Sequence, residues 1–169
     1  MKILKYLFEY ILIKFLFFIF KIIGYEKASN LGEKIGSTFG PIFRSKNKIT
    51  NNLIQTNVGK SEVERNKIIS GMWGNYGRIL AEYNFLDKFK NGSLNKNLKI
   101  NGLEHLKKIK ENDKQVVFVS GHFNNFELMA MQIDNFGINV AAIYRPLNNF
   151  FLNKTMENIR KNSICRNQI

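Results

Sequence analysis

Short apolar runs separated by polar turns mark the second half of the chain. The clearest of them, residues 116–119, is rich in β-branched side chains and ends at Ser120-Gly121. A short continuous apolar run of this kind is typical of a strand that is buried on both faces. Residues 139–143 show the same pattern, and residues 98–100, Leu-Lys-Ile, are expected to form a shorter strand. We therefore predict about three strands in this half of the chain.

Several stretches outside these runs have the pattern of apolar residues that is typical of helices. Ser61 followed by Glu64 is a capping box, which predicts a helix that begins there and continues to about residue 84. Because helices alternate with strands, the pattern predicts an α/β protein with a partial, largely parallel sheet and flanking helices. Further helices are predicted at residues 28–43, ending near Pro41, at residues 103–110 and at residues 148–162.

Regularly spaced glycines occur in two of the predicted helices. Small residues let two helices approach closely, either within a protein or in a membrane, and packing within the protein is the simpler interpretation. Trp73, which lies among the second set of glycines, is expected in the core. The two sets are Gly32, Gly36 and Gly40, and Gly71, Gly74 and Gly77.

The turn after residues 116–119 holds a histidine and an acid, His122 and Glu127. On one continuous helix these side chains would point about 140° away from each other. If Gly121 permits a backbone reversal and the helix begins near Asn124, they converge instead at the carboxyl end of a strand, where open α/β sheets bind ligands. A histidine oriented by a carboxylate removes a proton from a hydroxyl near neutral pH. The adjacent helix N-terminus would offer amides to an oxyanion or a phosphate.

The same residues also fit a purely structural interpretation. Asn124 followed three residues later by Glu127 is a capping-box-like helix start, in which His122 is an ordinary turn residue. The spacing alone leaves both interpretations open. The other histidine, His105, has no partner in the pattern and is expected at the surface.

The most apolar stretch lies at the amino terminus, in residues 3–23, and it is interrupted by Lys5, Glu9 and Lys14. A lysine at the centre of a bilayer costs about 2.5–3.5 kcal/mol, and each Leu, Ile or Phe offsets roughly 0.3–0.6 kcal/mol. We therefore predict a single membrane anchor over residues 1–24, spanning or deeply embedded. The residues after it lack the small-x-small pattern of a cleaved signal peptide. Basic residues follow the anchor closely and predict that the body lies on the cytoplasmic side.

The net charge indicates the kind of partner, and the cysteine content excludes some kinds of site. The 169 residues include 26 Lys and Arg against 13 Asp and Glu, for a net charge of +13. This excess indicates an anionic partner: a membrane surface, a phosphorylated substrate, an acidic protein or a nucleic acid. The single cysteine, Cys165, excludes an internal disulfide framework and a cysteine-ligated metal site. We predict neither a metal ion nor another cofactor.

Two sequence blocks resemble a known family. Gly-His-Phe-Asn-Asn-Phe-Glu at residues 121–127 is followed, at the distance of a helix and a strand, by Tyr-Arg-Pro-Leu-Asn-Asn at residues 144–149. Both blocks, in this order, resemble the bacterial lipid A biosynthesis (lauroyl/myristoyl) acyltransferases. The resemblance extends back through Asn52-Leu53 and residues 73–82 to the apolar N-terminal segment. It covers nearly the whole chain and about the first half of the family.

The chain departs from the family pattern at two positions of the first block. The family usually has Gly where this chain has Asn124, and Trp where it has Phe126. Asn tolerates left-handed backbone angles better than most residues other than Gly, so the turn can be kept.

The resemblance implies an activity and a set of site residues. Members of the family transfer a fatty acyl group from acyl carrier protein to a hydroxyl of the lipid A precursor, an acylated and phosphorylated glucosamine disaccharide. By this resemblance His122 would be the general base on that hydroxyl, and Glu127 would hold its tautomer and stabilise the imidazolium. Arg145, Asn125 and Tyr144 would bind substrate, and a loop salt bridge is the alternative role for Arg145.

The implied partners follow from that activity. They are an acyl carrier protein thioester as donor, a phosphorylated glycolipid as acceptor and the inner membrane at its cytoplasmic face, with no nucleic acid. No acyl-enzyme is required, and Cys165 is not expected to form one.

Two other functions fit part of the pattern. A glycerophospholipid acyltransferase shares the His-x-x-x-x-acid arrangement, although it typically has Asp at the position of Glu127. A basic, membrane-tethered binding protein for nucleic acid or anionic lipid needs only the anchor and the charge.

The resemblance also predicts an incomplete domain. Three parallel strands leave an edge with unpaired backbone groups, and the later motifs of the family have no counterpart in the sequence. We expect residues 25–169 to be the N-terminal part of an acyltransferase domain, and the chain alone to turn over little or no substrate.

Overall fold

The structure is a computed structural model, and it describes residues 2–43, 46–112 and 115–169. It contains two compact units. The helical unit comprises Leu16–Asn84, and the sheet unit comprises Met1–Phe15 together with Phe85–Ile169. The first helix, α1 (Lys2–Ile23), contributes residues to both units.

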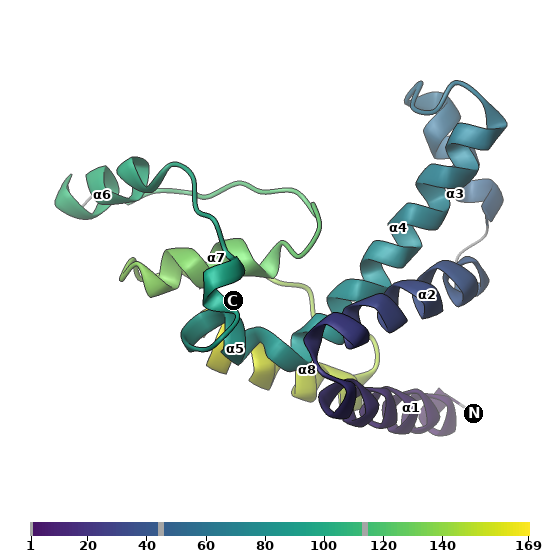
Figure 1. The fold of residues 1–169 in the computed structure, drawn as a ribbon, viewed down its shortest axis with the longest axis horizontal. Coiled ribbons are helices and arrows are strands. Elements are labelled where there is room, and N and C mark those ends of the chain that lie inside the picture. Colours follow the sequence, from purple (N-terminus) through teal and green to yellow (C-terminus); the bar gives the residue numbers. More distant parts are fainter. Residues whose placement is uncertain (1, 44–45, 113–114) are drawn as a thin grey trace. The chain divides into compact units, whose positions relative to one another are not determined.

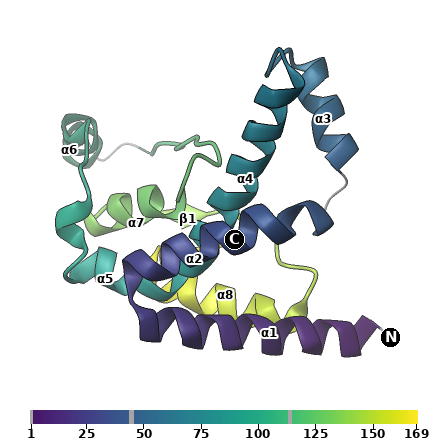
Figure 2. The same ribbon diagram turned by 45° about the vertical axis from the view of Figure 1, so that its right-hand side comes forward.

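Two long helices form the body of the helical unit. α2 (Tyr25–Phe43) and α4 (Glu62–Glu82) pack along each other, and α3 (Lys46–Gln55) lies between them in the sequence (Figures 1 and 2). The predicted capping box is present at the start of α4. The Ser61 hydroxyl accepts from the Glu64 amide at 3.1 Å, and the Glu64 carboxylate accepts from the Ser61 amide at 3.2 Å. α2 continues through Pro41 and ends at Phe43.

Glycines bring the backbones of α2 and α4 into direct contact. A Cβ added at Gly77 would overlap the backbone oxygen of Gly32, and one at Gly36 would overlap the backbone oxygen of Trp73. A Cβ at Gly71 would meet nothing within 4 Å. The prediction that the glycines serve helix packing within the protein is therefore confirmed, with Gly71 as the exception. Trp73, predicted to be in the core, is half-buried.

Polar side chains link the same two helices. The hydroxyl of Ser29 donates to the buried carboxylate of Glu82 at 2.8 Å. Arg78 donates to the Ser29 hydroxyl at 3.1 Å and forms an ion pair with Glu33. Because a buried carboxylate is costly without hydrogen bonds, these contacts favour one register of α2 against α4.

In its described residues, the sheet unit contains one small parallel sheet. β1 (Ala141–Ala142) pairs with β2 (Asn167–Gln168), and Ala141 lies opposite Asn167. α8 (Phe150–Ser163) connects the two strands, so the predicted parallel direction is confirmed for this pair. The other elements of the unit are α5 (Leu86–Asn91), η2 (Asn95–Asn97), α6 (Leu103–Asn112) and α7 (Glu127–Asn135); the short η1 (Tyr83–Phe85) spans the boundary with the helical unit.

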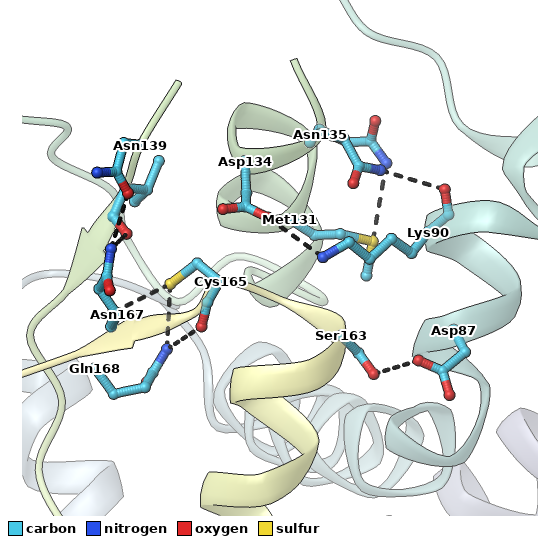
Figure 3. Close-up of polar contacts among 12 residues, drawn as sticks. Asp87, Lys90, Met131, Asp134, Asn135, Asn139, Ser163, Cys165, Asn167 and Gln168 are labelled. Carbon is cyan, nitrogen blue, oxygen red and sulfur yellow. Dashed lines mark hydrogen bonds and ion pairs between the residues drawn. The ribbon is translucent and has the colours of Figure 1, made fainter. Parts of the chain in front are cut away.

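Side-chain contacts join α5, α7 and α8 in the sheet unit (Figure 3). Ser163 donates to Asp87, and Lys90 lies 3.3 Å from the carboxylate of Asp134. Around these contacts the core is formed by buried apolar side chains of α5, of α7 and of the segment after α8. They include Leu86, Phe89, Met131 and Ile164.

The cap of α8 reaches a distant part of the chain. Asn149 accepts from the amides of Phe151 and Leu152, as predicted for a helix start here. Its amide also donates to the backbone oxygen of Tyr6 and to the carboxylate of Glu9. One buried side chain therefore caps α8 and holds it against α1.

Two of the predicted strands do not form. Residues 98–100 and 116–119 are irregular, and the side chains of Val117 and Val119 are 89% and 90% exposed. A strand is stable only when its backbone groups pair with a neighbour, and the described residues supply none for these runs. The α/β prediction is therefore corrected: the chain is mostly helical, with a two-stranded parallel sheet.

The amino-terminal segment is the continuous helix that the sequence predicts, but the predicted span is not supported. Within residues 2–43, 46–112 and 115–169, no helix combines the length and apolar character that crossing a membrane requires. Lys5, Glu9 and Lys14 lie within α1, and each charge in a bilayer core costs about 2.5–3.5 kcal/mol.

Candidate functional site

A cavity in the sheet unit brings together several of the predicted site residues. Its volume is about 190 Å³, and its lining is mostly apolar. The wall is built from the turn before α7, from the first turn of α7, from β1 and its end, from the last turn of α8 and from β2. Its polar and charged lining residues include His122, Glu127, Tyr144, Arg160 and Gln168.

Local interactions form the turn that carries His122. The Phe123 amide donates to the oxygen of Gly121 at 2.9 Å, and the Phe126 amide donates to the oxygen of Asn124 at 3.1 Å. Asn124 has a φ of 45°, so it takes the left-handed conformation that the family's Gly would adopt easily. The exposed ring of His122 packs on the ring of Phe126, with centroids 4.4 Å apart.

The prediction that Asn124 caps the following helix is wrong. α7 begins at Glu127, its N-cap residue is Phe126, and no side chain caps it. A capping residue needs an extended backbone, whereas Asn124 is left-handed. The sequence predicts that Gly121 permits the reversal of the backbone in this turn. In the structure, the residue with left-handed backbone angles is Asn124. The capping interpretation of Glu127 is removed with it.

Glu127 is held by an arginine from another helix. Its buried carboxylate accepts from Arg160 through Nε at 2.9 Å and through Nη2 at 2.7 Å, both on Oε1. The side chains are 8% and 18% exposed, so little water screens the pair. The guanidinium of Arg160 also lies 5.5 Å from the ring of Tyr144, within the range of a cation–π contact.

Of the three predicted substrate-binding residues, one lines this cavity and two do not. Tyr144 lines it, directly after β1. Arg145 is exposed and Asn125 is half-buried, and neither belongs to the lining. The structure therefore brings His122, Glu127 and Tyr144 to one cavity and leaves Arg145 and Asn125 outside it. His105 is exposed on α6, as predicted.

Cys165 lies outside the cavity lining. It is buried, and burial raises the pKa of its thiol above the usual value. The amide of Gln168 donates to its sulfur at 3.1 Å. Because the thiolate is the nucleophile, a raised pKa makes this cysteine a poor one near neutral pH.

Arg160 is the site residue that the sequence analysis left without a role. Its position does carry a signal, because Met156, Arg160 and Ile164 are spaced four residues apart. Residues at this spacing share one face of a helix, and Met156 and Ile164 are buried. A single arginine on an otherwise apolar stripe indicates a buried acidic partner, but the pattern does not name Glu127.

Comparison with known proteins gives one result. Residues 1–166 match the family described as bacterial lipid A biosynthesis acyltransferase. No curated protein and no solved structure gave a significant match.

Proposed function

Because the chain belongs to the bacterial lipid A biosynthesis acyltransferase family, we propose that the cavity of the sheet unit is its transfer site. There, an acyl group would pass from an acyl carrier protein thioester to a hydroxyl of a lipid A precursor. One observation supports this assignment above the others. His122 and Glu127, which the family resemblance marks as the base and its acid, line the same cavity.

In the proposed reaction, His122 accepts the proton of the acceptor hydroxyl. The oxygen attacks the thioester carbonyl, the carbon–sulfur bond breaks, and the proton passes from the imidazolium to the departing thiolate. A histidine suits this exchange because imidazole is the side chain that most often accepts and returns a proton in general acid–base catalysis. Glu127 orients the imidazole and stabilises its charged form.

The cavity lining and a residue outside it suit parts of the two substrates. Met129, Ala130 and Ile143 provide apolar surface for the carbons next to the thioester. The exposed guanidinium of Arg145 offers a planar fork for a phosphate of the acceptor outside the cavity. Since the acceptor is a membrane glycolipid, the proposal places the reaction at the cytoplasmic face of the inner membrane.

The test compares the wild type with His122→Ala and His105→Ala, each in the full-length context, in mixed micelles. The assay follows free thiol from acyl carrier protein thioester and the mass of the lipid A precursor. We expect His122→Ala to lower transfer about 100- to 10,000-fold, the usual contribution of a general base. His105→Ala is the matched control, because His105 is exposed on α6 and does not belong to the lining.

Three outcomes would contradict the proposal. Near wild-type transfer by His122→Ala would remove the assigned base. Absence of transfer by the wild type in that full-length context would overturn the activity itself. Acylation of a glycerophospholipid acceptor in place of the lipid A precursor would establish the alternative enzyme.

A further inference from the structure

The pairing of Glu127 with Arg160 supports an inference that rests on the proposed function. We infer that Arg160 is a positioning residue, which fixes the Glu127 carboxylate at the cavity wall so that it can orient His122. Both side chains line the cavity that contains His122. Arg160 would thus act on the reaction through Glu127 and not by touching the reacting atoms.

The hydrogen-bond geometry is the first argument. Arg160 donates from Nε and Nη2 to the same oxygen of Glu127, at 2.9 and 2.7 Å. Two donors of one planar group define the direction of a carboxylate more closely than a single ammonium does. The position of the Glu127 Oε1 atom at the cavity wall is therefore held from α8.

The position of Glu127 is the second argument. It is the first residue of α7, no side chain caps that helix, and an irregular turn precedes it. The start of α7 thus depends on contacts from outside the helix. Arg160 supplies such a contact, and it belongs to α8, which is fixed at one end by Asn149 and at the other by Ser163.

The surroundings of Arg160 are the third argument. Its guanidinium lies 5.5 Å from the ring of Tyr144, another lining residue. A ring on one side and a carboxylate at the edge leave the guanidinium few orientations. Arg160 therefore contacts the Tyr144 ring and the Glu127 carboxylate at the same time. Glu127 is the acid of the proposed His122–Glu127 dyad.

A buried ion pair by itself is weak evidence of a stabilising role. Desolvation of two charges offsets much of their attraction, and apolar pairs of similar volume often stabilise a protein equally well. The sheet unit contains a second ion pair for comparison, between Lys90 of α5 and Asp134 of α7. The side chains of Lys90 and Asp134 are 14% and 19% exposed. That pair is drawn in Figure 3 and does not line the cavity.

The experiment compares Arg160→Gln, Arg160→Lys, Arg160→Gly and Lys90→Gln in the transfer assay, with activity expressed per folded molecule. We expect Arg160→Gln to lower kcat about 100-fold, because a small misplacement of a catalytic group has an effect of that size. KM should change little. Arg160→Lys should restore only part of the loss, and added guanidinium should partly rescue Arg160→Gly. Lys90→Gln should keep wild-type kcat.

A double variant tests whether the effect passes through Glu127. If it does, Arg160→Gln should lower the rate of Glu127→Gln by less than about twofold, because the interaction is already lost. An undiminished 100-fold effect in the Glu127→Gln background would show that Arg160 acts independently, and would overturn the inference. So would wild-type kcat for Arg160→Gln in a protein whose wild type shows His122-dependent transfer.

A second measurement does not depend on activity. The Nε–H resonance of Arg160 in a ¹⁵N-labelled protein, assigned by its absence from Arg160→Lys, should be protected from exchange and should lose that protection in Glu127→Ala. Protection without transfer by the wild type would overturn the proposed function while leaving the pair intact. Transfer without protection would leave the function standing and overturn the positioning role.

Discussion

Two regions of the molecule differ in how well their sequence patterns predict their structure. They are the packed helices α2 and α4, and the segment of residues 115–144. In the pair, the capping box and the spaced glycines act as their patterns predict. In the segment, an equally clear apolar run at residues 116–119 forms no strand, and Asn124 does not cap the next helix. A helix satisfies its hydrogen bonds within itself, whereas a strand requires a partner from elsewhere. The comparison shows which signals are sufficient by themselves.

The largest effect should follow from a single methyl group between α2 and α4. Gly77→Ala would place its Cβ on the backbone oxygen of Gly32, and backbone relieves such an overlap poorly. We expect unfolding free energy to fall by at least about 3 kcal/mol. Urea unfolding followed by the fluorescence of Trp73, the single tryptophan, measures it. Gly71→Ala, which meets open space, should stabilise the protein by up to about 1 kcal/mol; equal effects at both positions would refute close backbone packing.

The next effect should come from the Glu127–Arg160 pair. Arg160→Met would leave the buried carboxylate of Glu127 without two of its hydrogen bonds. Because Arg160 is partly exposed, we expect a loss of about 2–3 kcal/mol, somewhat less than the roughly 3–5 kcal/mol of a fully buried pair. Far-UV circular dichroism during urea unfolding measures this loss. Adding Glu127→Met should recover part of it, and a double variant as unstable as the sum of both changes would contradict the pairing.

Removal of a helix cap should lower stability by a smaller amount, and the loss should differ between the cap of α4 and the cap of α8. Ser61→Ala removes an exposed local cap and should cost about 1 kcal/mol. Asn149→Ala removes a buried cap that also reaches Tyr6 and Glu9, so it should cost about 2 kcal/mol. Thermal unfolding of the two variants compares them directly. A larger loss for Ser61→Ala would reverse the distinction between a local and a long-range cap.

The smallest effect should be found at residues 116–119. Val117→Thr and Val119→Thr replace side chains that are 89% and 90% exposed, and each should change stability by less than about 0.5 kcal/mol. A buried strand would instead lose roughly 1–3 kcal/mol at each position, because a hydroxyl would be buried. Urea unfolding of both variants decides between these values. A loss of the larger size would restore the strand that the sequence predicts.

Much of the helical architecture could be predicted from neighbouring residues. Ser61 and Glu64 begin α4, the cap at Asn149 begins α8, and the spacing of Gly32, Gly36 and Gly77 produces the contact of α2 with α4. Each signal acts through a hydrogen bond or a steric limit within a few residues, or through a surface shape that repeats along one helix.

The sequence also determined part of the candidate site. The two motif blocks contain His122, Glu127 and Tyr144, which line one cavity, and the family match agrees with the resemblance that those blocks carry. Asn124 was expected to accept left-handed angles, and it has a φ of 45°. These outcomes depend on residue types at fixed spacing, which a sequence states directly.

The tertiary structure alone decided which long-range partners meet. It paired β1 with β2, left Val117 and Val119 exposed, and joined Glu127 to Arg160 across 33 positions of sequence. The reason is physical: closing a loop between distant residues costs entropy that no local pattern records, and the contact that repays it depends on the whole arrangement of α7, α8 and the sheet. The sequence by itself therefore determined the helices, the caps and the motif residues, whereas the strand pairs and the arginine behind Glu127 were decided by the fold.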